Sequence, residues 1–99
     1  MDRPSTLVVT AVPDPEQMPA VQEYLTAVLP LLVRAGGSPV KRLQVDDVVH
    51  GRQSSMVLVM DFESSDNITG LFESPEYAAL VPVRDRGFRE MNILVTSAM

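Results

Sequence analysis

The stretch from Ser55 to Phe62 constrains the fold more than any other part of the chain. It is short, it is rich in β-branched and unbranched apolar residues, and Gly51 and Ser64 flank it, which is typical of a buried strand. Side chains alternate along a strand, so the residues divide between two faces. Met56, Leu58, Met60 and Phe62 share one face, and Val57 and Val59 share the other. Both faces are apolar, and both need cover.

The other elements follow from apolar patterning and from glycine and proline. We expect strands at 6–12, 39–49 and 91–96, with 39–49 at an edge of the sheet because it begins with polar and charged residues. A first helix begins after Asp14 and ends at Gly36-Gly37, with a kink or break near 27–29 caused by Pro30. The apolar stripe on this helix is formed by Met18, Val21, Leu25, Val28, Leu29 and Leu32.

A second helical segment begins at Ser64 or Ser65 and restarts at Ser74, each serine acting as an N-cap. If the helix that restarts at Ser74 continues unbroken, it carries an apolar face with one cation on it. Pro82 leaves open whether this helix is divided in two. The residues of that face are Tyr77, Leu80, Val81, Arg84 and Phe88. A final strand at 91–96 completes the order β-α-β-β-α-β.

This order predicts an α+β, ferredoxin-like fold: a four-stranded antiparallel sheet with both helices on one face. A chain of 99 residues is long enough for one domain, which we assign to 1–99. The second sheet face would then expose more apolar surface than a soluble monomer tolerates. The simplest cover is a second copy packed sheet to sheet about a two-fold axis, so we predict a homodimer, a dimeric α/β barrel.

Composition narrows the function classes. The chain has no cysteine, which excludes disulfides and thiolate chemistry and is consistent with the cytoplasm, where we expect the protein. A net charge of −5 disfavours binding to nucleic acid or to an anionic membrane surface. We find neither a signal peptide nor an apolar run of membrane-spanning length.

Several short motifs in a fixed order resemble the bacterial domain-of-unknown-function 1330 family. They are Gly36-Gly37, His50-Gly51, the segment from Asp61 to Ser64, the segment from Ser74 to Tyr77, and Arg84 behind it. That family is similar to the dimeric α/β-barrel superfamily, which includes cofactor-independent monooxygenases, isomerases and haem-binding enzymes. The resemblance implies a two-fold dimer with a small pocket. Family members commonly have Glu-Gly where this chain has His50-Gly51, so a role of that carboxylate does not carry over.

Arg84 and Tyr77 are the principal candidates for a binding site. They are seven residues apart, so an unbroken helix would bring them to one face, where a guanidinium and a hydroxyl can bind an anionic or carbonyl-bearing ligand. The alternative is structural: the Tyr77 ring packs, and Arg84 pairs with Asp85, Asp61 or a carboxylate of the partner copy. We expect ligand contacts from Arg84, Tyr77, Phe62 and Phe72.

Two further residues are candidates for moving a proton. His50 is a candidate because histidine is the one side chain that unperturbed changes charge near neutral pH. It lies in an expected turn with no nucleophile or second histidine nearby, so a solvated turn histidine is the simpler interpretation. Asp61 is expected to form a cross-strand charge pair with Lys41 or Arg42. Asp46 and Asp47 point to opposite faces of a strand and cannot share a metal ion.

Three functions remain open: a dimer that binds a small molecule, a cofactor-independent enzyme, and a dimer that acts through protein interaction alone. As an enzyme it would use Arg84 to stabilise negative charge and His50 or Asp61 to move a proton. We favour binding of a small, mostly apolar ligand with an anionic or carbonyl group. We expect no metal and no cofactor, and the lone histidine disfavours haem. The alternative is an enzyme of the monooxygenase or isomerase type.

Overall fold

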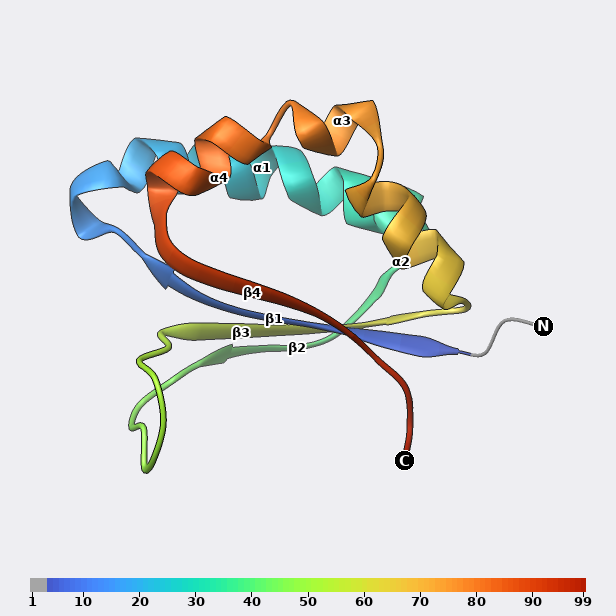
Figure 1. The fold of residues 1–99 in the computed structure, drawn as a ribbon, viewed down its shortest axis with the longest axis horizontal. Coiled ribbons are helices and arrows are strands. Elements are labelled where there is room, and N and C mark those ends of the chain that lie inside the picture. Colours follow the sequence, from blue (N-terminus) through green and yellow to red (C-terminus); the bar gives the residue numbers. More distant parts are fainter. Residues whose placement is uncertain (1–3) are drawn as a thin grey trace.

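The computed structural model describes residues 4–99, which form one sheet with a layer of helices on one side (Figure 1). In chain order the strands are β1 (Ser5–Pro13), β2 (Ser38–Gln44), β3 (Met56–Phe62) and β4 (Phe88–Thr96). The helices are α1 (Met18–Arg34), α2 (Ser65–Phe72), α3 (Pro75–Ala78) and α4 (Val81–Gly87). The predicted β-α-β-β-α-β order and the placement of the helices on one face are confirmed.

The sheet has the strand order β2-β3-β1-β4, and its pairs are antiparallel. The apolar strand β3 therefore lies inside the sheet between β2 and β1, and β2 is an edge strand as its polar start predicts. Met60 lies opposite Leu7 on β1, and Leu7 lies opposite Val95 on β4. Directly opposed residues share a face, so the register produces continuous apolar rows across the sheet.

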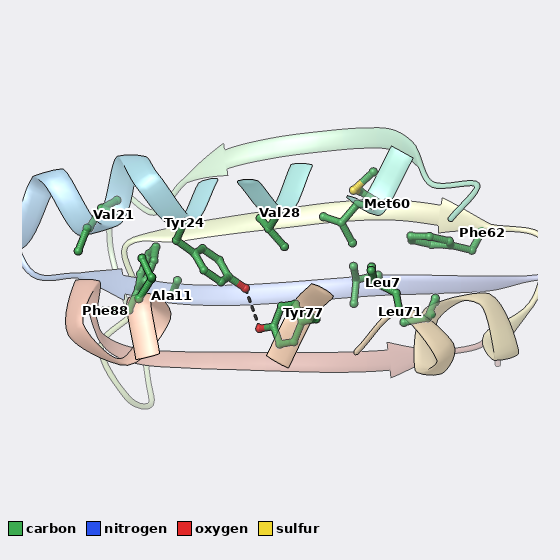
Figure 2. Packing of buried hydrophobic residues seen from close by; sticks show 14 residues of the cluster. Leu7, Ala11, Val21, Tyr24, Val28, Met60, Phe62, Leu71, Tyr77 and Phe88 are labelled. Carbon is green, nitrogen blue, oxygen red and sulfur yellow. Dashed lines mark hydrogen bonds between the residues drawn. The ribbon is translucent and has the colours of Figure 1, made fainter. Parts of the chain in front are cut away.

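The helix-covered face holds the core (Figure 2). Leu7, Met60 and Phe62 from the sheet are buried against Val28 and other residues of the helices. The second face of the sheet has no cover within residues 4–99 and is half-exposed or exposed. We call it the bare face, and its apolar residues are Val8, Leu43, Val57, Val59 and Leu94.

Helix α1 differs from the prediction at its centre: it runs without interruption through Pro30. A proline inside a helix leaves the carbonyl four residues earlier without its usual partner, here that of Thr26. Pro30 and Thr26 are both exposed, so this carbonyl faces water and the helix tolerates the loss. Ala20, Val21, Tyr24, Val28 and Leu32 form the buried face of α1.

The connection between β2 and β3 is longer than predicted. β2 ends at Gln44 rather than at Val49, and the connection that contains His50 extends away from the helices (Figure 1). The predicted pairing of Asp61 with Lys41 or Arg42 is therefore wrong, because Asp61 lies opposite Ser38 on β2. Its Oδ1 instead accepts a hydrogen bond from the Thr6 hydroxyl at 2.7 Å.

The second helical region is divided, but before Pro82 rather than at it. Ser64 caps α2 and Ser74 caps α3, both as predicted, and each hydroxyl accepts a backbone N–H three residues later. α3 ends at Ala78, and Pro82 lies in the first turn of α4, where its missing N–H costs no helical bond. Phe88 begins β4 instead of ending a helix.

Two glycines provide a matched test of the packing. A Cβ on Gly37 would lie 2.7 Å from the Phe62 ring and 2.8 Å from the Met60 methyl group, whereas a Cβ on Gly70 in α2 would meet nothing within 4 Å. We expect Gly37→Ala to lower the free energy of unfolding by about 1–3 kcal/mol through overpacking. Gly70→Ala should raise it by about 0.5–1 kcal/mol through helix propensity. Urea unfolding measures both, and an unchanged midpoint for Gly37→Ala would contradict the tight contact.

Candidate functional site

Two tyrosines from different elements meet between the helices and the sheet. Tyr24 projects from α1 and Tyr77 from α3, and their hydroxyl oxygens lie 2.8 Å apart (Figure 2). The two side chains are only 4% and 3% exposed. Aromatic rings pack edge to face around them: Phe88 against Tyr24 at 5.4 Å and Phe72 against Tyr77 at 4.7 Å between ring centroids. The hydroxyls are thus fixed in an apolar setting.

Arg84 on α4 joins this pair. Its Nη1 donates a hydrogen bond to the Tyr77 hydroxyl at 3.2 Å, and its Nε donates to Oδ1 of Asp85 at 3.0 Å. The guanidinium also lies 5.9 Å from the centroid of the Tyr77 ring, within cation–π range. The Arg84 side chain is 26% exposed and that of Asp85 is 64% exposed, so solvent screens this ion pair. The structural alternative, a pair with Asp85, is therefore realised alongside the contact with Tyr77.

The surroundings keep the tyrosine protonated and the arginine charged. Burial raises the pKa of the Tyr24 hydroxyl, and the hydrogen bond with Tyr77 raises it further, which outweighs the opposing effect of the Arg84 cation. Partial burial lowers the pKa of Arg84, but its hydrogen bonds to Tyr77 and Asp85 more than compensate, so that this pKa is raised overall. At neutral pH the cluster therefore combines the Arg84 cation with the neutral phenol of Tyr24.

The Tyr24–Tyr77–Arg84 cluster has hydrogen-bond donors without an acceptor in the described part of the chain. Each phenol carries one hydroxyl hydrogen, and the single hydrogen bond between the two oxygens uses only one of them. The Tyr77 oxygen additionally accepts from Arg84. Within residues 4–99, the second hydroxyl hydrogen and the Nη2 group of Arg84 have no acceptor. When Tyr24 is the donor of the tyrosine pair, the unused hydroxyl hydrogen is on Tyr77, and a carbonyl or carboxylate oxygen beside Arg84 would satisfy both donors.

Arg84 separates two open hollows between the second helical region and β4. One is about 440 Å³, and its walls include Phe72, Tyr77, Val81 and Val95. The other is about 470 Å³ and more polar, with Asp85, Arg89 and Glu90 in its wall. Arg84 and Ile93 line both. The first hollow combines a largely apolar wall with one cation, Arg84, beside the Tyr77 hydroxyl, and Thr69, Glu73 and Ser74 also line it. We call it the Arg84 hollow.

The structure brings only some of the predicted site residues together. Arg84, Tyr77 and Phe72 line the Arg84 hollow. Phe62 lines neither hollow; it is 3% exposed and packs near the end of the sheet remote from Phe88 (Figure 2). His50 is exposed in the connection between β2 and β3, and Asp61 is exposed and bonded to Thr6. Neither of these titratable groups reaches Arg84 in the structure.

Tyr24 is the residue of the cluster that the sequence analysis missed. The predicted stripe on α1 omitted it, although it lies three residues after Val21 and four before Val28, which is the spacing of one helix face. That spacing predicts its burial. Its hydrogen bond to Tyr77, 53 residues away, has no signal in the sequence.

The described part of the chain contains neither a cluster of metal-ligating side chains nor a membrane-spanning helix. Among residues 4–99, no three His, Asp or Glu side chains lie close enough together to hold a metal ion. None of the helices in this range combines the length and apolar character needed to cross a bilayer.

Solved structures share this fold at low sequence identity. A protein of unknown function from Rhodopseudomonas palustris has a TM-score of 0.82 and 15% identity, covering 100% of this chain and 85% of its own. A protein from Nitrosomonas europaea, provisionally described as an antibiotic biosynthesis monooxygenase, has a TM-score of 0.69 and 14% sequence identity, and the match covers 100% of this chain and 93% of its own. A protein from Bacteroides fragilis, described as dimeric and ferredoxin-like, has a TM-score of 0.65 and 11% sequence identity, and the match covers 96% of each chain. At these identities the likeness establishes the ferredoxin-like fold.

The sequence itself matches one family model along nearly its whole length. No curated protein matches the chain. The family model, whose description is "Domain of unknown function (DUF1330)", matches residues 5–99, which contain all four strands and the Tyr24–Tyr77–Arg84 cluster. This agrees with the resemblance found from the ordered motifs. The chain therefore belongs to the DUF1330 family.

Proposed function

We propose that the protein is a cytoplasmic homodimer, one domain per chain, that binds a small, mostly apolar ligand through an anionic or carbonyl group. The ligand occupies the Arg84 hollow, with its oxygen toward Arg84 and its apolar part against Phe72, Val81 and Val95. The observation that carries this proposal is the set of unused donors on a fixed guanidinium and a buried tyrosine pair.

The energetics of the hollow favour such a ligand. Arg84 is held on two sides by Tyr77 and Asp85, so little side-chain freedom is left to lose when an oxygen binds. Charge-assisted hydrogen bonds are the strongest that a partly buried site offers. A volume of about 440 Å³ is within the usual range for small-molecule sites, and an apolar wall with a few fixed donors is their usual composition.

The dimer is supported by the bare face. Val8 lies between Val59 on β3 and Leu94 on β4 in the sheet register, and Val57 lies opposite Leu43 on β2. This apolar patch spans all four strands, and residues 4–99 of a single chain provide nothing to cover it. A second copy offers a self-complementary surface of the same chemistry. The Bacteroides fragilis relative with this fold is described as dimeric.

The alternative function is a cofactor-independent enzyme. The donors at Arg84 would also stabilise negative charge developing on a substrate oxygen, and the Nitrosomonas europaea relative is provisionally described as a monooxygenase. However, His50 and Asp61 line neither hollow, so the two residues predicted to move a proton do not support it. Glu73, in the wall of the Arg84 hollow, is the carboxylate best placed for that role. Binding is therefore the function that the geometry favours.

Arg84→Gln tests the binding site. Native mass spectrometry of protein purified gently from its own host should show a retained small molecule, and Arg84→Gln should lose it. The same substitution should weaken binding of 1-naphthoate by about 10- to 100-fold in calorimetry, because a charge-assisted hydrogen bond is removed. 1-Naphthalenemethanol, which lacks the carbonyl, should bind weakly to both proteins.

Arg86→Gln is the matched control. Arg86 is on the same helix, it is half-exposed, and it lines neither hollow, so this variant should bind like the wild type. If Arg84→Gln instead elutes as an altered species on gel filtration, Arg84 is structural. If the wild type retains no small molecule and binds neither 1-naphthoate nor 2-acetylnaphthalene, the binding proposal fails.

Val59→Lys tests the dimer. This substitution places a cation at the centre of the bare face, where a partner copy would bury it unpaired. We expect the dissociation constant of the dimer, measured by sedimentation, to rise by at least about 100-fold. Val33→Lys is the control, since Val33 is 59% exposed on α1, away from the sheet. A wild-type chain that sediments as a folded monomer at micromolar concentration would overturn the dimer.

A further inference from the structure

A second hollow lies at the opposite edge of the sheet from Arg84, between α1 and the edge strand β2. It is about 190 Å³, and we call it the β2-edge groove. Its lining consists of apolar side chains with a single charged exception. These residues are Leu25, Leu29, Arg42, Leu43, Met56, Val57 and Leu58. None of them lines either of the hollows beside Arg84.

The groove exists because α1 does not cover the whole sheet. Residues such as Val28 and Leu32 bury α1 against the central strands, whereas every residue of β2 is exposed. The step from the helix down to the edge strand leaves Leu25, Leu29, Met56 and Leu58 only half-buried. These four large side chains also contact the core, so their positions are held while one side of each remains open.

A smaller cavity adjoins the groove. It is about 40 Å³, shares Leu25, Leu29, Met56 and Leu58 with the groove, and is also lined by Tyr24, Phe88 and Met91. Its lining is almost entirely apolar and includes two methionines. Methionine side chains are flexible and adapt to irregular ligands, so this side of the groove can adjust to an apolar tail.

Arg42 supplies a cation at the mouth of the groove. It lies directly opposite Leu58 in the strand register and therefore projects from the helix-covered face, whereas Leu43 and Val57 reach the groove from the bare face at the edge of the sheet. Within residues 4–99 no carboxylate lies at ion-pair distance from Arg42, and the groove itself contains none. An apolar trough with one uncompensated cation at its rim is complementary to a molecule with a short apolar tail and an anionic head.

We propose that the β2-edge groove is a second binding site, which takes a short-chain amphipathic anion with its tail between α1 and β3 and its head at Arg42. A volume of about 190 Å³ is below the range of cofactor-sized sites, which restricts the occupant to a small molecule. The site shares no residue with the Arg84 hollow, so it does not depend on the function proposed for that hollow.

Octanoate is the probe, and the ¹³C-labelled methyl group of Met56, which lines both the groove and the inner cavity, is the reporter. Octanoate should shift the Met56 methyl resonance saturably. The affinity for the fatty acid should fall about three- to four-fold for each methylene removed, from octanoate through hexanoate to butyrate, because a shorter tail buries less apolar surface. Arg42→Gln should lower the affinity for octanoate about three- to five-fold and leave the affinity for 1-octanol unchanged.

Three variants distinguish octanoate bound in the β2-edge groove from octanoate bound elsewhere on the molecule. Lys41→Gln is the matched control, since Lys41 lies opposite Val59 on the bare face and should leave octanoate binding unchanged. Leu29→Trp should fill the groove and abolish the Met56 shift while far-UV circular dichroism stays native. Arg84→Gln should leave the shift intact. The absence of a Met56 shift with octanoate would overturn the second site. A shift that is lost in Arg84→Gln and retained in Arg42→Gln would also overturn it, but that result would support binding in the Arg84 hollow.

Discussion

The structure depends on a sheet that is apolar on both faces but covered by helices on only one. β3 imposes this condition because it lies inside the sheet and alternates Met, Leu and Phe on one side with Val on the other. Right-handed crossovers place the helices on the same side, so no rearrangement of α1 and α2 can cover both faces. The core is therefore formed within one chain, whereas the bare face carries the apolar surface with which a second copy would pack.

The candidate site follows from how that helical layer is filled. Tyr24 and Tyr77 are buried, and a buried hydroxyl requires a hydrogen-bond partner. Each satisfies the other, and Arg84 reaches the Tyr77 oxygen from the rim of the layer. The result is a guanidinium that is oriented by the core yet still faces an open hollow. The same three side chains thus contribute to the packing of the layer and form the site at which we propose that a ligand binds.

The break between α3 and α4 shows how a predicted contact survives an interruption of the helix. Tyr77 and Arg84 are expected to meet because residues seven apart share a helix face, and the turn residues Ala79 and Leu80 between the two helices keep right-handed helical dihedral angles. Tertiary contacts hold the two side chains in place: Tyr77 is anchored by Tyr24, and α4 packs against α1, where Gly87 approaches Ala20 closely. The spacing in the sequence brings the pair to one side, and the tertiary structure fixes its geometry.

Local patterns in the sequence determined the element order, the edge position of the strand predicted at 39–49, the serine caps and the two apolar faces of 55–62, because each follows from residues near one another in the chain. Only the tertiary structure decided the rest. The register placed Ser38 instead of Lys41 opposite Asp61 on β2, since the length of the β2–β3 connection was not encoded by any local turn signal. Pro30 remains in a continuous helix because it and Thr26 lie on the exposed face of α1. The pairing of Tyr24 with Tyr77 joins two elements 53 residues apart, and such contacts arise only when the whole core packs.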